Sequence, residues 1–249
     1  MPPSPGAPTG ARAPPEPQPP TPTTTSCGCR PGAATAPATS RPDPRRFPTR
    51  SPTYAVVEAA RESSGRPVHL VGASYGAILA LHTAAADPRD LRSLAIFEPP
   101  LFAAGPQTVP LLDRYRAALE RDDAPAMAAV RNEVTRVPAE IVAAFAAAAG
   151  DRRPAPAEAR RVAVGWPHDL EALAADSTDL TRWSAITVPT LLMQGADTWE
   201  PMPSTLDALA PAMPRARRIS WPGQSHFVTS TAPELVADAL RRFFAEVAG

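Results

Sequence analysis

Four short apolar runs, each followed by a loop and then by residues at helical spacing, form the clearest pattern in the chain. Continuous apolar runs of this length are typical of strands that are buried on both faces of a parallel sheet. They predict strands at Val68–Val71, Leu91–Phe97, Thr190–Gln194 and Arg217–Trp221. Because strands and helical segments alternate, the pattern predicts an α/β fold in which helices cover both faces of a parallel sheet.

Helical spacing accounts for much of the remaining hydrophobic pattern. Residues 54–64 and 76–86 predict helices before and after the first strand. No strand pattern occurs between the second and third strands, where apolar residues recur at helical spacing around 111–119 and again after Pro138. We therefore predict a helical insertion at residues 103–184.

The last helix has the most complete start signal. Thr231 is the expected N-cap, with Pro233 in the first turn and Glu234 as the capping acid. The residues predicted to pack this helix against the sheet are Val236, Leu240, Phe243 and Val247.

The chain divides into parts of very different composition. Prolines crowd residues 1–52, where Phe47 is the only aromatic residue, so little there can offset the entropy of ordering and we predict disorder. Residues 53–102 and 185–249 are predicted to form the two halves of one α/β core, separated in sequence by the helical insertion.

Charge and composition narrow the class of partner. The formal net charge is zero, and all 25 basic residues are arginines that are interleaved with acidic residues. Because the sequence has no run of basic residues, it does not predict a positively charged surface that would bind nucleic acid. We expect a small-molecule or protein partner. The arginine, alanine and proline usage indicates a G+C-rich bacterial gene.

The sequence shows no recognisable secretory signal, membrane span or metal-binding motif. No secretory pattern begins the chain and no apolar run reaches membrane-spanning length, so we expect a cytoplasmic protein without a membrane partner. Cys27 and Cys29 have no second Cys or His pair at metal-ligand spacing, and we expect exposed thiols there. We expect no metal and no cofactor.

The segment Gly72-Ala-Ser-Tyr-Gly76 lies between a predicted strand and a predicted helix. That context is the one required of a nucleophile elbow, in which the flanking glycines let strand and helix approach and the serine projects from the carboxyl edge of the sheet. Ser74 is therefore the candidate nucleophile. The amide of Tyr75, at the start of the helix, is the candidate donor to a developing oxyanion.

A serine hydroxyl needs a base, and His226 is the candidate. It follows the last predicted strand, which suits the chain order serine, acid, histidine. The other three histidines lie in a predicted strand (His69), a predicted helix (His82) and the insertion (His168). Two carboxylates compete for the third role: Asp197, which we prefer because it follows the third strand, and Glu98, at the end of the second.

These motifs resemble those of the α/β-hydrolase superfamily, and in detail the small esterase- or lipase-like hydrolases of bacteria. The segments that carry the resemblance are VHLVGASYGA, FEPPL, ITVPTLLMQG and PGQSH. The resemblance implies a hydrolase core and assigns residues 103–184 to a helical cap that walls the substrate pocket.

The chain departs from that pattern at two points. The resemblance places the acid three residues after the glycine that ends its strand, and that residue here is Thr198, with Asp197 one position early. It also implies strands and a His-Gly loop before the elbow. The proline-rich segment stands there instead, so we expect the core to lack those strands.

The leading hypothesis is a serine hydrolase that acts on a small-molecule ester or similar acyl bond through Ser74, His226 and an acid. Two alternatives stay open. One is a catalytically impaired homologue that binds a ligand or protein. The other is cofactor-free haloperoxidase-like activity on the same fold.

Overall fold

The computed structural model of this chain describes residues 52–149 and 155–248. Residues 1–51, which hold Cys27, Cys29 and nearly all of the segment predicted to be disordered, lie outside the described residues.

Within the described residues, four parallel strands form one sheet. They are β1 (Val68–Ala73), β2 (Leu91–Phe97), β3 (Thr190–Gly195) and β4 (Ala216–Trp221). Their order across the sheet is the order along the chain, β1-β2-β3-β4. The predicted parallel α/β sheet is confirmed, and the predicted strands differ from the observed ones only at their ends.

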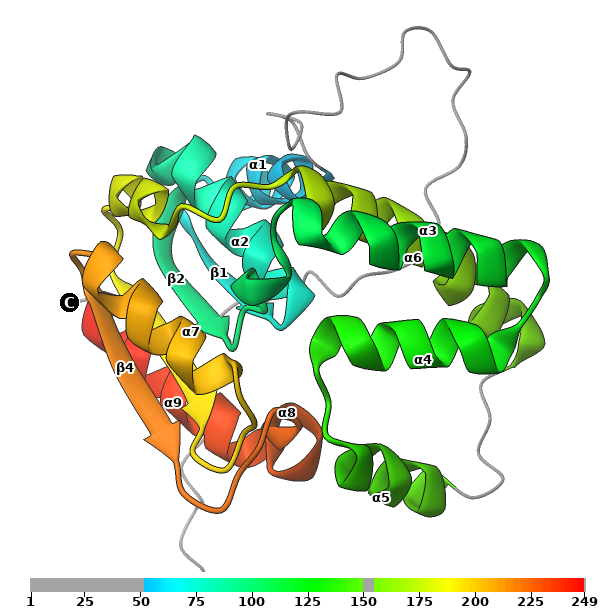
Figure 1. Cartoon of the computed structure of the whole chain (residues 1–249). Helices are drawn as coiled ribbons and strands as arrows, with labels where there is room; N and C mark the ends of the chain where they lie inside the picture. The colour runs from blue at the N-terminus through cyan, green and yellow to red at the C-terminus, as the bar shows by residue number, and fades with distance from the viewer. Residues whose placement is uncertain (1–51, 150–154, 249) are drawn as a thin grey trace, which may run out of the picture.

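The two central strands, β2 and β3, are buried along almost their whole length because both faces of the sheet are covered, whereas the edge strand β4 is partly exposed. In β2, Leu94 and Ile96 belong to one hydrophobic cluster and the alternating Ala95 and Phe97 to a second. The first cluster includes side chains of α1 (Pro52–Ser64), α2 (Tyr75–Ala86) and α7 (Met202–Leu209); the second includes those of α9 (Pro233–Ala248). Helices therefore pack on both sides of the sheet (Figure 1).

A group of helices between β2 and β3 projects to one side of the sheet (Figure 1). Its four α-helices are α3 (Val109–Glu120), α4 (Ala124–Thr135), α5 (Ala139–Ala149) and α6 (Pro156–Ala175). Tyr115 of α3 is fully buried and its hydroxyl donates to the Ala163 carbonyl of α6 over 3.2 Å, which ties these two helices together. Over the described residues, no helix is long and apolar enough to cross a membrane.

The start of the last helix differs from the prediction. Thr231 ends a separate short helix, α8 (Val228–Thr231), where its hydroxyl donates to the Phe227 carbonyl over 3.2 Å. Ala232 has a non-helical backbone conformation and separates α8 from α9, which begins at Pro233. The prediction that Thr231 is the N-cap of the last helix was wrong, because Thr231 is the last residue of the short helix α8. The predicted apolar stripe of this helix does pack on the sheet.

A buried ion cluster joins the end of α6 to α2. The Arg182 guanidinium donates to both oxygens of Asp176, over 2.5 and 2.7 Å, and His82 Nε2 of α2 lies 3.1 Å from the same carboxylate. The guanidinium also stacks 4.1 Å from the centre of the buried Trp183 ring. Burial raises the pKa of Asp176, but the hydrogen bonds from Arg182 and His82 outweigh it and bring the pKa to about 2.

Asp176→Asn is expected to destabilise the protein by about 3 kcal/mol, because the substitution leaves a largely buried guanidinium without its counter-charge. A low native-state pKa stabilises the fold above the ordinary value of 3.8, and this contribution is lost as pH falls towards about 2. Urea unfolding at a series of pH values tests both points.

The difference between wild type and Asp176→Asn should therefore shrink over that acid range. Glu171→Gln is the matched control, because it removes an ion pair with Arg116 in which both side chains are more than two-fifths exposed. That change should cost under about 1 kcal/mol. Equal stabilities for wild type and Asp176→Asn at neutral pH would contradict the prediction.

Candidate active site

One residue, Ser74, makes the turn from β1 into α2. The strand ends at Ala73, the helix begins at Tyr75, and Ser74 has φ 52° and ψ −127°. A non-glycine residue at positive φ is strained and persists only where its surroundings hold it. The Ser74 amide does so in part, by donating to the Phe97 carbonyl of β2 over 2.8 Å.

Gly72 makes this turn possible because β1 and α2 nearly touch. A Cβ atom at Gly72 would lie 2.4 Å from the Gly76 carbonyl oxygen and 2.8 Å from the Ala77 Cα. Both contacts are to backbone, which cannot swing aside as a side chain can. The glycine two residues before the serine is therefore a steric requirement, as the sequence motif predicts.

His226 lies in the loop after β4, next to Ser74. Its Nε2 atom is 3.1 Å from the Ser74 hydroxyl oxygen. The loop comes this close because the end of β3 has no side chain in its way: a Cβ at Gly195 would lie 2.4 Å from the Gln224 carbonyl. The structure thus brings together two residues that are 152 positions apart in sequence.

Glu98 completes the arrangement from the end of β2. Its Oε2 atom is 2.6 Å from His226 Nδ1, and its side chain is 0% exposed against 14% for the imidazole. An ionised carboxylate only accepts hydrogen bonds, so Nδ1 carries the proton and Nε2 is left to accept from the Ser74 hydroxyl. This is the tautomer that a serine nucleophile requires.

Asp197, the carboxylate that we preferred from the sequence, is not brought to His226. Its side chain is exposed, and among the described residues it has no hydrogen bond or ion pair with the imidazole. Its backbone amide instead donates to the Gln224 carbonyl over 2.8 Å, in the loop that carries His226. The loop after β3 is near the site, but its acid is exposed, and the carboxylate that the structure places against His226 is Glu98.

Two further donors that the sequence did not identify contact Glu98. The Gly195 amide donates to Oε1 over 2.8 Å and the Thr198 hydroxyl donates to Oε2 over 3.0 Å. A buried carboxylate needs such donors, because desolvation otherwise makes its charged form very unfavourable. Thr198 occupies the position where the resemblance places an acid, and this was the one signal that could have marked it.

The other histidines lie elsewhere. His69 Nδ1 is 2.7 Å from the Ser93 hydroxyl, and its ring stacks 4.2 Å from Phe244. Burial lowers the pKa of His69, and Arg92 and Arg66 lower it further. His82 belongs to the Asp176 cluster, and His168 is exposed on α6.

Aromatic rings surround the His226 imidazole. The ring centres of Trp199, Phe97 and Phe227 lie 5.5, 5.7 and 5.7 Å from it. Trp199 also reaches the helical insertion, because its indole N–H donates to the Thr135 carbonyl at the end of α4 over 3.2 Å. One side chain therefore contacts both the imidazole and the insertion.

Tyr75 contacts the insertion as well. Its amide belongs to the first turn of α2, where the helix dipole favours negative charge, and this is the position expected of an oxyanion donor. Its hydroxyl hydrogen-bonds to Asp169 of α6. Burial raises the pKa of Asp169, while the bond from Tyr75 and the nearby His168 act in the opposite direction.

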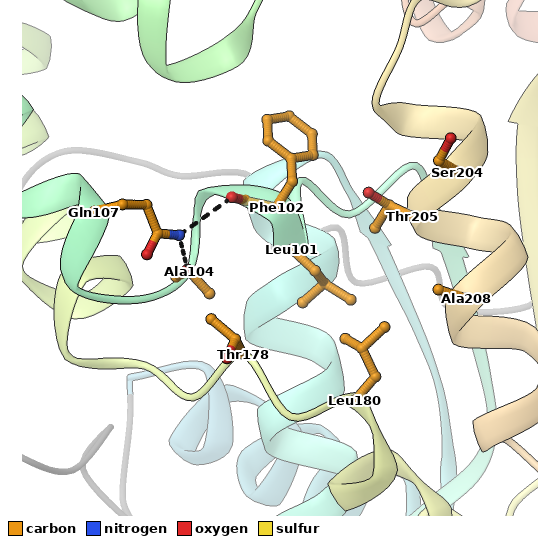
Figure 2. Close-up of a pocket in the computed structure, with 9 residues that line it drawn as sticks. All are labelled: Leu101, Phe102, Ala104, Gln107, Thr178, Leu180, Ser204, Thr205 and Ala208. Carbon is orange, nitrogen blue, oxygen red and sulfur yellow. Dashed lines mark hydrogen bonds between the residues drawn. The ribbon is translucent and has the colours of Figure 1, made fainter.

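A cavity of about 270 Å³ lies apart from these residues. Figure 2 shows that its lining residues come from the turn at residues 101–104, from the segment containing Thr178 and Leu180, and from α7. Ser74, Glu98 and His226 are not among the residues that line it. Within the described ranges, no group of three or more His, Cys, Asp or Glu side chains could hold a metal ion.

Comparison with protein families identifies a match over most of the chain. A family model described as the alpha/beta hydrolase family matches residues 18–239. No curated protein matches the chain.

Solved structures share this architecture. An alpha/beta hydrolase from Sphaerobacter thermophilus is 28% identical, with a TM-score of 0.58 over 75% of this chain and 70% of its own. An alpha/beta hydrolase enzyme from a Medee basin deep-sea metagenome library is 18% identical, with a TM-score of 0.58 over 77% and 70%. An enol-lactonase from Burkholderia xenovorans is 17% identical, with a TM-score of 0.55 over 77% and 71%.

Gly72→Ala is expected to lower the free energy of unfolding by about 2–3 kcal/mol, because the added methyl group meets backbone atoms of α2. Gly165→Ala, in α6, is the matched control, since a Cβ there meets nothing within 4 Å. It should gain about 0.5–1 kcal/mol from helix propensity. Chemical denaturation measures both, and a Gly72→Ala protein as stable as wild type would refute the steric argument.

Proposed function

Because the chain belongs to the alpha/beta hydrolase family, we propose that it is a serine hydrolase that cleaves an ester or similar acyl bond. The observation that carries the proposal is the hydrogen-bonded series Ser74, His226, Glu98, with distances of 3.1 and 2.6 Å. Within this series a base can take the serine proton and a buried carboxylate can stabilise the resulting imidazolium.

The first half of the reaction forms an acyl-enzyme. The Ser74 oxygen attacks the carbonyl carbon of the substrate as its proton passes to His226 Nε2, which gives a tetrahedral oxyanion. When the intermediate collapses, the bond to the leaving group breaks and the leaving oxygen takes the proton from Nε2. Glu98 stays ionised throughout and holds the imidazole by Nδ1.

The Tyr75 amide is the proposed donor to the oxyanion. It follows the nucleophile directly and opens α2, so that the amide and the helix dipole both favour negative charge beside Ser74. A preorganised donor of this kind contributes about 3 kcal/mol to transition-state stabilisation.

The second half releases the acid. A water molecule loses a proton to His226 Nε2 and attacks the acyl carbon, and the bond to the Ser74 oxygen then breaks as that oxygen takes the proton back. Acid product and free enzyme result, so each proton borrowed by the imidazole is returned.

The helical insertion acts in this proposal as a cap over the site. Two contacts support that role: Trp199 links the imidazole to α4, and Tyr75 links the residue after the nucleophile to Asp169 of α6. Helices anchored at these two points would border the space in which an acyl substrate meets Ser74.

A fluorophosphonate probe is expected to label Ser74, because such probes react with serines that an adjacent base activates. Ser74→Ala should abolish labelling and lower hydrolysis of p-nitrophenyl esters by at least about a thousandfold. Mass spectrometry of the labelled peptide identifies the site. Ser204→Ala, on α7, is the control and should leave both signals intact; labelling that survives Ser74→Ala would refute the assignment.

Glu98→Gln and Asp197→Asn form a pair that tests which carboxylate acts on His226. Glu98→Gln should slow ester hydrolysis by about a thousandfold to ten-thousandfold, since a neutral amide no longer stabilises the imidazolium or fixes its tautomer. Asp197→Asn should stay within about twofold of wild type, because an exposed side chain contributes little. If Asp197→Asn lowered kcat far more than Glu98→Gln, Asp197 would be the acid that acts on His226.

A further inference from the structure

The Glu98 carboxylate is held at both oxygens, and the two sets of contacts are unequal. Oε1 accepts one hydrogen bond, from the Gly195 amide over 2.8 Å. Oε2 accepts two, from His226 Nδ1 over 2.6 Å and from the Thr198 hydroxyl over 3.0 Å. Thr198 therefore binds the same oxygen that binds the imidazole.

Apart from Thr198 and the imidazole itself, the Gly195 amide at Oε1 is the one donor to this carboxylate among the described residues, and one donor restrains its terminal torsion, which is broad in glutamate, only weakly. A second donor at Oε2 restricts the rotation and fixes where this oxygen lies relative to Nδ1. Threonine suits the task because its branched side chain has few χ1 conformations. A carboxylate only accepts, so the Thr198 hydroxyl must be the donor.

The backbone on either side of Thr198 is also anchored. Gly195 ends β3 within the sheet, paired with Trp221 of β4. Trp199 is buried, and its indole is bonded to the Thr135 carbonyl of α4. The hydroxyl is thus presented to Glu98 from a segment fixed at both ends.

We propose that Thr198 is a positioning residue that holds the Glu98 carboxylate in line with His226. The proposal rests on the proposed function, in which that pair serves Ser74. Thr198 is hydrogen-bonded to Glu98 and acts on the imidazole through that carboxylate.

Loss of the Thr198 hydroxyl has two effects with different signatures. The carboxylate becomes less well aligned, which slows proton transfer from Ser74. It also keeps more negative charge on Oε2, which favours the protonated imidazole and moves the acid limb of the pH profile to higher pH.

Glu98 is the one charged side chain in contact with His226 among the described residues, since the rings of Phe97, Trp199 and Phe227 are uncharged.

The test measures the rate of fluorophosphonate labelling of the full chain across a pH series. Thr198→Val, which keeps the side-chain shape but loses the donor, should react about tenfold more slowly, with its acid limb at higher pH. Thr198→Ser keeps the donor and should restore the wild-type rate and profile. Thr205→Val is the matched control: it removes a hydroxyl that is bonded to the Pro201 carbonyl over 2.7 Å and not to Glu98, and it should leave both unchanged.

Wild-type rate and pH profile in Thr198→Val would overturn the proposal, as would an equal loss in Thr205→Val. The Nδ1 proton of His226, observed by proton NMR, gives a readout that needs no activity. Its resonance should shift or broaden in Thr198→Val and remain in Thr198→Ser, and an unchanged resonance in Thr198→Val would also overturn the proposal. An unlabelled wild-type chain with the expected NMR response would instead refute the proposed function and leave the positioning role standing.

Discussion

A buried carboxylate is stable only with hydrogen-bond donors around it, and the donors to Glu98 hold together the loops at the carboxyl edge of the sheet. Its donors come from the end of β3, from the loop after β3 and from the loop after β4. Each loop that reaches the carboxylate is thereby fixed relative to the others. The arrangement of Ser74 and His226 depends on this side chain, because it sets both the position and the tautomer of the imidazole.

The register of the sheet makes the convergence possible. The pairs Ala73 with Phe97, Phe97 with Met193, and Gly195 with Trp221 bring the carboxyl ends of all four strands to one edge. Outer strands of a four-stranded sheet are nevertheless about 14 Å apart, at roughly 4.8 Å per strand. The loop after β4 must therefore fold back over its neighbours before His226 can meet Ser74, and the missing side chain at Gly195 gives it the space.

The helical insertion is joined to this edge and to the core behind it. Trp199 and Tyr75 connect α4 and α6 to residues of the site, while Asp176 fastens the end of α6 to α2 through a buried ion cluster. Buried ion pairs of this type are costly to break by removing one partner. The insertion and the site are consequently packed together, with the Trp199 side chain in contact with both the His226 ring and the end of α4.

The sequence by itself determined the sheet, the helical nature of the insertion and the elbow at Ser74, because these follow from local periodicity and from steric needs within a few residues. It also singled out His226 by its order in the chain. Which of Glu98 and Asp197 lies against His226 was decided only by the tertiary structure, as were the start of α9 and the hydrogen bond from Thr198 to Glu98. Both carboxylates lie at the same edge of the sheet, and which one turns inward depends on contacts between loops that are about a hundred residues apart, a distance over which no local pattern carries information.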